Sequence, residues 1–488
     1  MNGPVRHVAL TVFAVFAVMI LMLTWIQAVD ADRYRDDPRN LRTVAARAGS
    51  ERGVIISADG VVIAESVADP EDPRAFRRFY PEGSLYAHTV GYDSLLFGDT
   101  GLEESRAAEL TSDRDATLSG VMSALFGDDL RPRGLRLTLD HELQSVANEA
   151  LGDQRGVVIA LDPTTGETLA MVSKPDFDPN LLQGPGAGAY GDDLDADPAR
   201  PLLNRGIRET YAPGSAFKVI TTTAGLETGV AGPGTLYPNP RELSLPGSTA
   251  TIRNFDRRTC GTSDAVSLAV AFARSCNTTF AALGMEVGPG PLVDAAEGYG
   301  FGLEIPFELG GVASFIPSVE AFGDDLPAVA QSAIGQRDVR ATPLQMALAA
   351  AAVANGGEVI EPYVVSEVFA SDGDVEWIAE PIVWRRAMSP ATAGALAELM
   401  EQAVASGTGS RAAVPGVRIA GKTGTAEVPN SPPHAWFVGY GPVDPEPGER
   451  QVVVVVVVES GGNVGEDATG GRLAAPIAQR VLSTFFGL

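Results

Sequence analysis

Ser215 and Lys218 are three residues apart in the segment Pro213-Gly214-Ser215-Ala216-Phe217-Lys218, which has the pattern of a loop entering a helix. Residues three apart on a helix share one face, so the two side chains can meet. A serine hydroxyl becomes a good nucleophile when an adjacent base removes its proton, and a desolvated lysine can be that base. The pair therefore indicates nucleophilic catalysis, although a single Ser-x-x-Lys spacing also occurs by chance.

Lysine is rare in this chain. Lys174, Lys218 and Lys422 are the only lysines among 36 basic residues, and the others are arginines. Arginine stays protonated in proteins, whereas a buried lysine can lose its proton. The three lysines are therefore the first positions at which we expect chemistry that arginine cannot perform.

Ser275 and Asn277 form a second polar motif, Ser-x-Asn. Ser275 could relay a proton, and Asn277 could hold Lys218 or a substrate amide. The alternative is a helix cap or turn, a common use of both residue types.

A third motif, Lys422-Thr423-Gly424-Thr425, lies on a predicted strand. It offers a positive charge, two hydroxyls and a glycine that lets a ligand approach the backbone. These groups suit an extended anionic ligand beside the strand. A second ammonium near Lys218 would also lower the pKa of Lys218 and favour the neutral amine.

Residues 416–423 also match the phosphate-loop pattern G-x-x-x-x-G-K-[ST]. That pattern requires a helix after its last residue. Pro429, Pro432 and Pro433 exclude a helix there, so a nucleotide site is not expected.

Apolar patterning predicts the elements that position these motifs. Seven consecutive valines, 452–458, suit a central strand buried on both faces. These valines belong to a strand expected at 451–459. Also expected are strands at 417–428 and 434–443, a hairpin of 156–162 with 167–173, and a helix over 472–486 packed on the sheet.

Capping residues predict further elements. Thr342-Pro343 opens an alanine-rich helix that Asn355-Gly356-Gly357 ends, and Asp140 caps a helix that runs to residue 151. Also expected are a hairpin within 52–64, a strand at 135–139, and a long Gly/Pro/Asp-rich loop, 175–201, with a functional or mobile role.

The amino-acid composition argues against two classes of function, nucleic-acid binding and metal binding. The 488 residues have a net charge of −26, which disfavours a nucleic-acid partner. Four scattered histidines and two cysteines fit no metal site or disulfide-rich scaffold, so no cofactor is expected.

Residues 8–29 carry no charge and are long enough to cross a bilayer. We expect a single-pass anchor after a short cytoplasmic tail, 1–7; a cleaved signal peptide or buried helix is the alternative. Four arginines after the span, against Arg6 before it, do not favour a cytoplasmic N-terminus. The large part is nevertheless placed outside the cytoplasm, because of the chemistry that its motifs imply.

The three motifs, in this order, resemble the penicillin-binding protein and serine β-lactamase superfamily. Further segments resemble class B penicillin-binding transpeptidases: Arg52-Gly53-Val54-Ile55, Leu161-Asp162-Pro163, Phe177-Asp178-Pro179-Asn180, Asn204-Arg205, Gly335-Gln336 and Thr342-Pro343-Leu344-Gln345. Length, single anchor and the run Pro432-Pro433-His434-Ala435-Trp436 are similar to actinobacterial members of that class. One departure is Ala216, where the family often has threonine.

The resemblance implies roles for these residues. Ser215 would be the acylated nucleophile and Lys218 its base, with Ser275 and Asn277 supporting proton transfer and substrate. Lys422, Thr423, Gly424 and Thr425 would bind the substrate carboxylate. The backbone N–H groups of Ser215 and Thr425 would form the oxyanion hole.

The implied fold is an α/β (α+β) transpeptidase domain at 151–488, with an antiparallel sheet flanked by helices. A small mixed domain at 30–150 would be a pedestal or docking surface. Outside the cytoplasm Cys260 and Cys276 could form a disulfide beside the nucleophile; two unpaired buried thiols are the alternative.

The implied function is a peptidoglycan D,D-transpeptidase that β-lactams inhibit, with stem peptides as substrates. A glycosyltransferase and other cell-wall proteins are the expected partners. The alternatives are a serine β-lactamase, which needs a deacylating base, a β-lactam-sensing domain, and an inactive cell-wall scaffold.

Overall fold

The computed structural model describes residues 2–28, 30, 49–68, 75–111, 131–255 and 257–488. The chain divides into two compact units, one of residues 1–51 and 66–77 and the other of residues 52–65 and 78–488. The first unit contains α1 (Asn2–Ala28), of which residues 3–27 are long and apolar enough to cross a membrane, with a mean hydropathy of 2.5. This agrees with the predicted span, although its last residue, Val29, and the four arginines at 33, 35, 39 and 42 lie outside the described residues.

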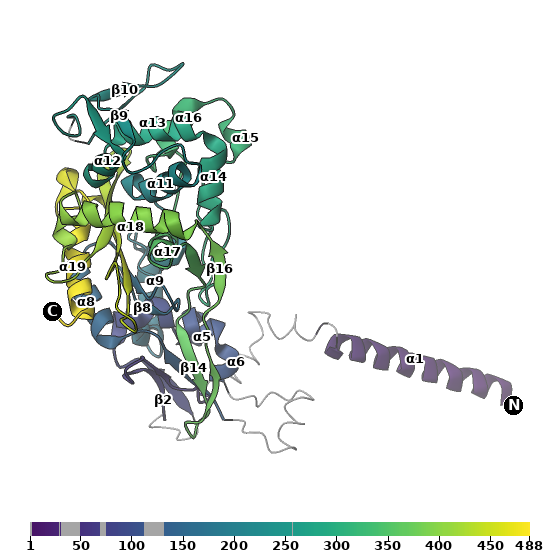
Figure 1. Cartoon of the computed structure of the whole chain (residues 1–488). Helices are drawn as coiled ribbons and strands as arrows, with labels where there is room; N and C mark the ends of the chain where they lie inside the picture. The colour runs from purple at the N-terminus through teal and green to yellow at the C-terminus, as the bar shows by residue number, and fades with distance from the viewer. Residues whose placement is uncertain (1, 29, 31–48, 69–74, 112–130, 256) are drawn as a thin grey trace. The chain divides into compact units, whose positions relative to one another are not determined.

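The larger unit is built on a five-stranded antiparallel sheet (Figure 1). Its strands follow one another in the order β17 (Ala420–Val428), β18 (Ser431–Gly441), β19 (Val452–Val458), β7 (Gly156–Leu161) and β8 (Thr168–Lys174). The three predicted C-terminal strands and the predicted hairpin are therefore confirmed. The strand that begins at Ser431 also confirms that no helix follows the phosphate-loop pattern.

The valine strand β19 lies in the middle of this sheet and is fully buried. Val452, Val454, Val456 and Val458 face one core, together with α8 (His141–Leu151) and α19 (Ala474–Phe485). The alternate valines face a second, larger core that contains α17 (Pro343–Ala354). Successive side chains of a strand point to opposite faces, so an all-valine strand fits between two helical layers.

Both capping predictions are confirmed. The Thr342 hydroxyl accepts from the N–H of Gln345 at the start of α17, and the Asp140 carboxylate accepts from the N–H of Leu143 at the start of α8. Each side chain pairs one of the donors that the first turn of a helix leaves unpaired.

Helices between β8 and β17 hold the motif-bearing segments. The upper part of Figure 1 contains α11 (Lys218–Glu227), α12 (Leu268–Arg274), α13 (Asn277–Val287), α14 (Pro289–Gly298) and α16 (Leu326–Ser332). Below them, α18 (Pro390–Ala405) packs on β17. The helix that carries Lys218 and the strand that carries Lys422 therefore share one core.

A second, six-stranded sheet lies at the lower end of the larger unit in Figure 1. Its strands are β15 (Val375–Ile378), β14 (Val365–Phe369), β6 (Gly134–Leu137), β1 (Ile55–Ile56), β2 (Val62–Ala68) and β3 (Phe76–Phe79), in that order. The predicted hairpin within 52–64 and the predicted strand at 135–139 are confirmed. Because β14 pairs with β6, this sheet combines segments from both sides of residue 150, and the domain boundary placed there stays a prediction.

The prediction that residues 175–201 form a loop throughout was wrong. This segment contains a 3₁₀ turn, η2 (Pro179–Leu182), and a ten-residue helix, α9 (Ala187–Ala196). Its few apolar residues order it, since Phe177, Leu182 and Leu194 are buried together in a small separate cluster.

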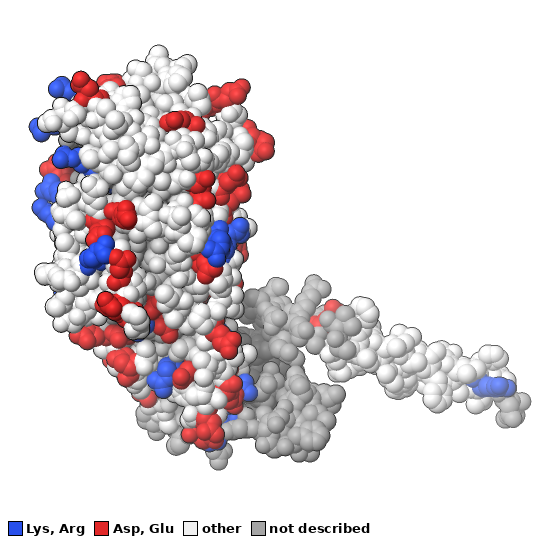
Figure 2. Space-filling model, in the orientation of Figure 1, with Lys and Arg blue, Asp and Glu red and all other residues white. Residues whose placement is uncertain are grey.

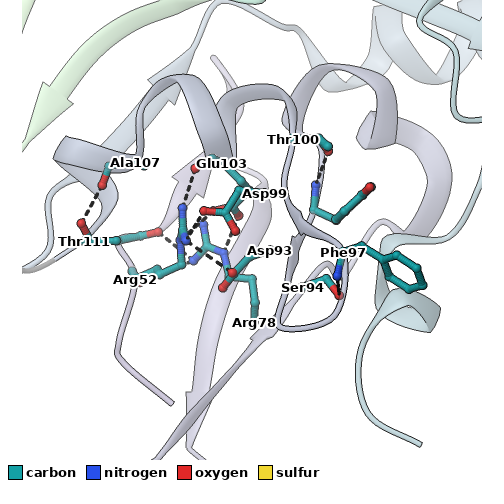
Figure 3. Close-up of polar contacts among 12 residues, drawn as sticks. Arg52, Arg78, Asp93, Ser94, Phe97, Asp99, Thr100, Glu103, Ala107 and Thr111 are labelled. Atoms are coloured by element: carbon teal, nitrogen blue, oxygen red, sulfur yellow. Dashed lines mark hydrogen bonds and ion pairs between the residues drawn. The ribbon is translucent and has the colours of Figure 1, made fainter. Parts of the chain in front are cut away.

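A buried ionic cluster lies beside the six-stranded sheet (Figure 3). The Arg52 guanidinium lies 3.4 Å from Asp93, 3.2 Å from Asp99 and 2.9 Å from Glu103. Arg78 reaches Glu103 at 2.6 Å and donates to the carbonyl of Gly53 at 2.8 Å. The cluster ties the start of the sheet to α5 (Gly101–Ser105).

We expect this cluster to make stability depend on pH through Asp93. Burial and the nearby Asp99 raise the pKa of Asp93 to about 7, although Arg52 opposes the rise. A raised carboxyl pKa means that the folded state binds the proton more tightly, so its stabilisation is complete below about pH 4 and is lost as pH rises through 7. Between pH 5 and pH 8 the unfolding free energy of Asp93→Asn should therefore rise by about 1–3 kcal/mol relative to the unmodified protein.

Urea unfolding of the detergent-solubilised chain at several pH values measures this difference. Asp153→Asn, which removes an exposed carboxylate outside the cluster, is the control. Parallel pH curves for Asp93→Asn and the unmodified protein would contradict the prediction.

Candidate active site

Ser215 lies on a tight turn that touches β17. It belongs to the 3₁₀ turn η3 (Gly214–Phe217), which leads directly into α11 at Lys218. Gly214 has a φ of +51°, and a Cβ added there would lie 2.6 Å from the carbonyl oxygen of Thr425. On the other side, a Cβ at Gly424 would lie 2.7 Å from the carbonyl oxygen of Pro213. Glycine at both positions therefore lets the serine turn lie directly against the strand.

Lys218 is fully buried beneath this turn. Its Nζ donates to the Ser275 carbonyl oxygen at 2.8 Å and to Asn277 Oδ1 at 2.8 Å, and it lies 3.3 Å from Ser275 Oγ. The lysine and the Ser-x-Asn motif are thus brought together across a long sequence separation. Lys218 is fixed by these contacts rather than by a hydrogen bond to Ser215.

Ser275 joins the two buried lysines. It ends α12 in the left-handed conformation, with φ +61°, and so turns the chain into α13. Its hydroxyl oxygen accepts from Lys422 Nζ at 2.8 Å, while Lys218 Nζ lies 3.3 Å away on the same atom. A single hydroxyl therefore connects the two amines.

Burial changes the protonation of both lysines. The ring centroid of Phe280 lies 5.2 Å from Lys218 Nζ, and that of Phe272 lies 5.8 Å from Lys422 Nζ. Burial, with the nearby charge of Lys422, holds the pKa of Lys218 well below its ordinary value. Burial alone lowers the pKa of Lys422 to about 7. The lowered pKa favours the neutral form of Lys218, the form that a base requires.

The hydroxyls of the third motif face the same region. Thr423 Oγ1 lies 2.6 Å from Thr408 Oγ1, and the N–H of Gly470 reaches Thr425 Oγ1 at 3.5 Å. Thr423 and Thr425 are two residues apart on β17, so both side chains project from one face of the sheet. Thr408 is a contact that the motifs did not predict.

A cleft of about 1200 Å³ opens over these groups. Its lining includes Ser215, Ser275, Asn277, Thr423 and Thr425. Lys218 and Lys422 lie fully buried below that lining. The structure therefore brings all eight candidate catalytic and substrate-binding residues to one place.

Cys260 and Cys276 form a disulfide with a Cα–Cα distance of 6.0 Å. Cys276 lies between Ser275 and Asn277, so the bond ties the Ser-x-Asn motif to the loop after β11 (Thr251–Arg253). Asn277 adds a second link, because its side-chain amide donates to the carbonyl of Arg253 at 3.0 Å.

A buried network behind Ser215 was missed from the sequence. Glu459 accepts from Arg205 Nε at 2.9 Å and from the Tyr211 hydroxyl at 2.7 Å, and Trp436 Nε1 donates to the Ala212 carbonyl at 3.2 Å. Burial opposes ionisation, but the Tyr211 hydroxyl and the nearby guanidiniums hold the pKa of Glu459 below its ordinary value. One signal was a glutamate placed directly after the valine strand.

His434 also belongs to this network. Its Nδ1 accepts from the N–H of Ser460 at 3.0 Å, and its ring packs edge-on against Tyr211 with centroids 5.3 Å apart. Among the described residues, no group of three or more histidines, cysteines and carboxylates is placed to hold a metal ion.

The chain matches two domain families of penicillin-binding proteins. The penicillin binding protein transpeptidase domain matches residues 156–483, and the penicillin binding protein A dimerisation domain matches residues 52–134. The chain therefore belongs to the penicillin-binding protein transpeptidase family.

The similarity to individual relatives extends over nearly the whole chain. The chain is 40% identical to peptidoglycan D,D-transpeptidase PbpA of Mycolicibacterium smegmatis, over 99% of each protein. Penicillin-binding protein A from M. tuberculosis, solved as a ceftriaxone acyl-enzyme complex, matches with a TM-score of 0.82 at 37% identity, over 89% of this chain and 98% of that one. PBP2 of Pseudomonas aeruginosa matches with a TM-score of 0.73 at 31% identity, over 90% and 96%. The predicted family, fold class and serine acyl-transferase class are confirmed.

Proposed function

We propose that the chain is a peptidoglycan D,D-transpeptidase that cross-links stem peptides through an acyl-enzyme on Ser215. The observation that carries the proposal is the Ser275 hydroxyl, which connects buried Lys218 to buried Lys422 beside the cleft that Ser215 lines. One lysine is thereby placed to act as the base and the other to bind an anion.

Acylation begins when neutral Lys218 removes the proton of Ser215. Ser215 Oγ then attacks the carbonyl carbon of the D-Ala-D-Ala amide, and the backbone N–H groups of Ser215 and Thr425 stabilise the oxyanion. The proton passes from Lys218, directly or through Ser275, to the leaving nitrogen. The carbon–nitrogen bond breaks, D-alanine leaves, and the acyl group stays on Ser215.

Lys422, Thr423 and Thr425 bind the terminal carboxylate of the donor peptide. A bound carboxylate favours the charged form of Lys422 and so offsets the effect of burial on its pKa. Gly424 leaves room for the serine turn beside these groups.

The acyl group is then transferred to an amine of a neighbouring stem peptide. Lys218 removes a proton from this amine as it attacks the ester carbonyl, and the proton returns to Ser215 Oγ as the ester bond breaks. The overall reaction needs no cofactor, because the D-Ala-D-Ala amide bond that is broken is replaced by a new amide bond to the acceptor amine.

Peptidoglycan lies outside the cytoplasm, so the unit that contains the cleft is placed there and α1 anchors it in the membrane. This fits the disulfide, which an oxidising compartment permits. A transpeptidase needs glycan strands made by another protein, so a glycosyltransferase and other cell-wall proteins are its expected partners, with residues 30–150 as a docking surface.

Penicillin labelling of the detergent-solubilised chain tests the proposal. We expect one stable adduct per chain, located on Ser215 by peptide mass mapping, and D-alanine release from a donor peptide when an acceptor amine is present. Rapid turnover of penicillin would instead indicate a serine β-lactamase. A stable adduct without D-alanine release would indicate a sensing domain, and the absence of an adduct an inactive scaffold.

A further inference from the structure

The cleft is basic although the chain is strongly acidic. The net charge of the chain is −26, yet the only carboxylate in the described lining is Glu427. The lining contains six arginines: Arg253, Arg257, Arg274, Arg337, Arg411 and Arg472. So many like charges around one opening repel each other and raise the local concentration of anions.

Two of these arginines already have acidic partners. Arg253 pairs with Glu242 at 3.0 Å, and Arg337 pairs with Asp325 at 3.2 Å. Within the described ranges, Arg274, Arg411 and Arg472 make no ion pair, and all three are exposed. Their charge is available to a ligand.

These three arginines come from segments that meet at Thr408. The N–H of Thr408 donates to the carbonyl of Ala273, next to Arg274, at 3.1 Å. A Cβ added at Gly471, next to Arg472, would lie 2.5 Å from the Thr408 carbonyl oxygen, and Arg411 follows in the short turn η4 (Ser410–Ala412). We call Arg274, Arg411 and Arg472 the arginine wall.

The arginine wall adjoins the carboxylate-binding part of the site. Thr408 Oγ1 lies 2.6 Å from Thr423 Oγ1, and Gly471 adjoins both threonines. In Figure 2, several basic side chains lie along the upper left edge of the larger unit, and acidic side chains are scattered over the face that is shown.

One terminal carboxylate does not account for this charge. On the proposed function, that carboxylate is bound by Lys422, Thr423 and Thr425. A guanidinium binds a carboxylate through two parallel hydrogen bonds, so three exposed guanidiniums offer capacity for further acidic groups. The wall lines the same cleft as Ser215, and extended peptide advances roughly 3.3–3.6 Å per residue, so we expect residues near the scissile amide to lie close to the wall.

We infer that the arginine wall binds a second carboxylate of the stem peptide, and that the preferred donor has a free acidic group besides its C-terminal one. This inference rests on the proposed function and specifies its substrate class. Amidation of that acidic group would remove the charge that the guanidiniums bind.

The test compares two soluble donor peptides that both end in D-Ala-D-Ala and differ in one group, a side-chain carboxylate or its carboxamide. Neither peptide contains phosphate or glycan. For the full chain in detergent, kcat/KM for D-alanine release should be about 10-fold or more higher with the acidic donor. Raising the salt concentration should reduce this ratio, because the arginines are exposed.

In the double variant Arg274→Gln/Arg411→Gln, kcat/KM for D-alanine release should be nearly the same with the two donors, so that the ratio is close to one. Arg241→Gln/Arg480→Gln is the matched control, since it also removes two positive charges but neither residue lines the cleft. The control should keep the ratio of the unmodified protein. Penicillin labelling of each variant at Ser215 shows that its fold and nucleophile are intact.

A ratio near one in the unmodified protein, or an unchanged ratio in Arg274→Gln/Arg411→Gln, would overturn the inference. With penicillin labelling and D-alanine release present, that result leaves the proposed function standing. Loss of both labelling and D-alanine release in the unmodified protein would instead refute the proposed function.

Discussion

Replacing Lys218 by alanine is expected to lower the rate of Ser215 acylation by penicillin by about 10³-fold or more. Lys218 is fully buried, and burial together with Lys422 lowers its pKa, which favours the neutral amine that the proposed mechanism requires as its base. Without it, the hydroxyl must lose its proton to water. The Ser275 hydroxyl and the Asn277 amide also lose the group that they hold.

The measurement is the second-order rate constant for labelling by a fluorescent penicillin. Lys218→Met is the companion variant, because it fills most of the same volume without an amine and so separates loss of the base from a packing defect. Lys174→Ala is the matched control. Lys174 is the third lysine of the chain, does not line the cleft, and forms an ion pair with Asp176 at 2.7 Å. Labelling of Lys218→Met at the unmodified rate would exclude Lys218 as the base.

The residues that are easiest to predict from this sequence are those whose chemistry has no substitute. Lys218 and Lys422 are two of only three lysines among 36 basic residues, and these two lysines meet at one serine hydroxyl. The valine strand was equally clear, because only a strand between two apolar layers buries seven valines in succession.

Contacts between distant segments were harder to predict. The sequence gives no sign that Glu459 pairs with Arg205 and Tyr211, or that β14 pairs with β6, because local patterns do not specify partners far along the chain. Thr408 and the arginine wall were missed for the same reason. Each residue looks like an ordinary surface residue until the fold brings the three segments together.

The segment 175–201 shows a second reason why a prediction from the sequence can fail. Its glycines, prolines and aspartates predicted a loop, and composition alone supports that prediction. Burial of Phe177, Leu182 and Leu194 in one small cluster was enough to order a turn and a helix. Tertiary packing therefore outweighed weak local propensity.

Replacing Lys422 by alanine is expected to reduce kcat/KM for acylation by about 10²-fold, the size of effect that follows removal of one buried charged partner. The variant should also need a higher pH. Lys422 lowers the pKa of Lys218, so its removal raises that pKa. Acylation rises with pH as Lys218 loses its proton, and this rise should therefore shift to higher pH in Lys422→Ala.

A carboxylate-blocked ligand separates the two effects of Lys422. The unmodified protein should react much faster with a penicillin than with its methyl ester, because the proposed function has Lys422, Thr423 and Thr425 bind the free carboxylate. Lys422→Ala should lose most of this difference while still labelling Ser215, whereas Lys174→Ala should keep it. If Lys422→Ala still preferred the free acid as strongly as the unmodified protein, the carboxylate would have to be bound elsewhere in the cleft, and the arginine wall would be the first alternative to test.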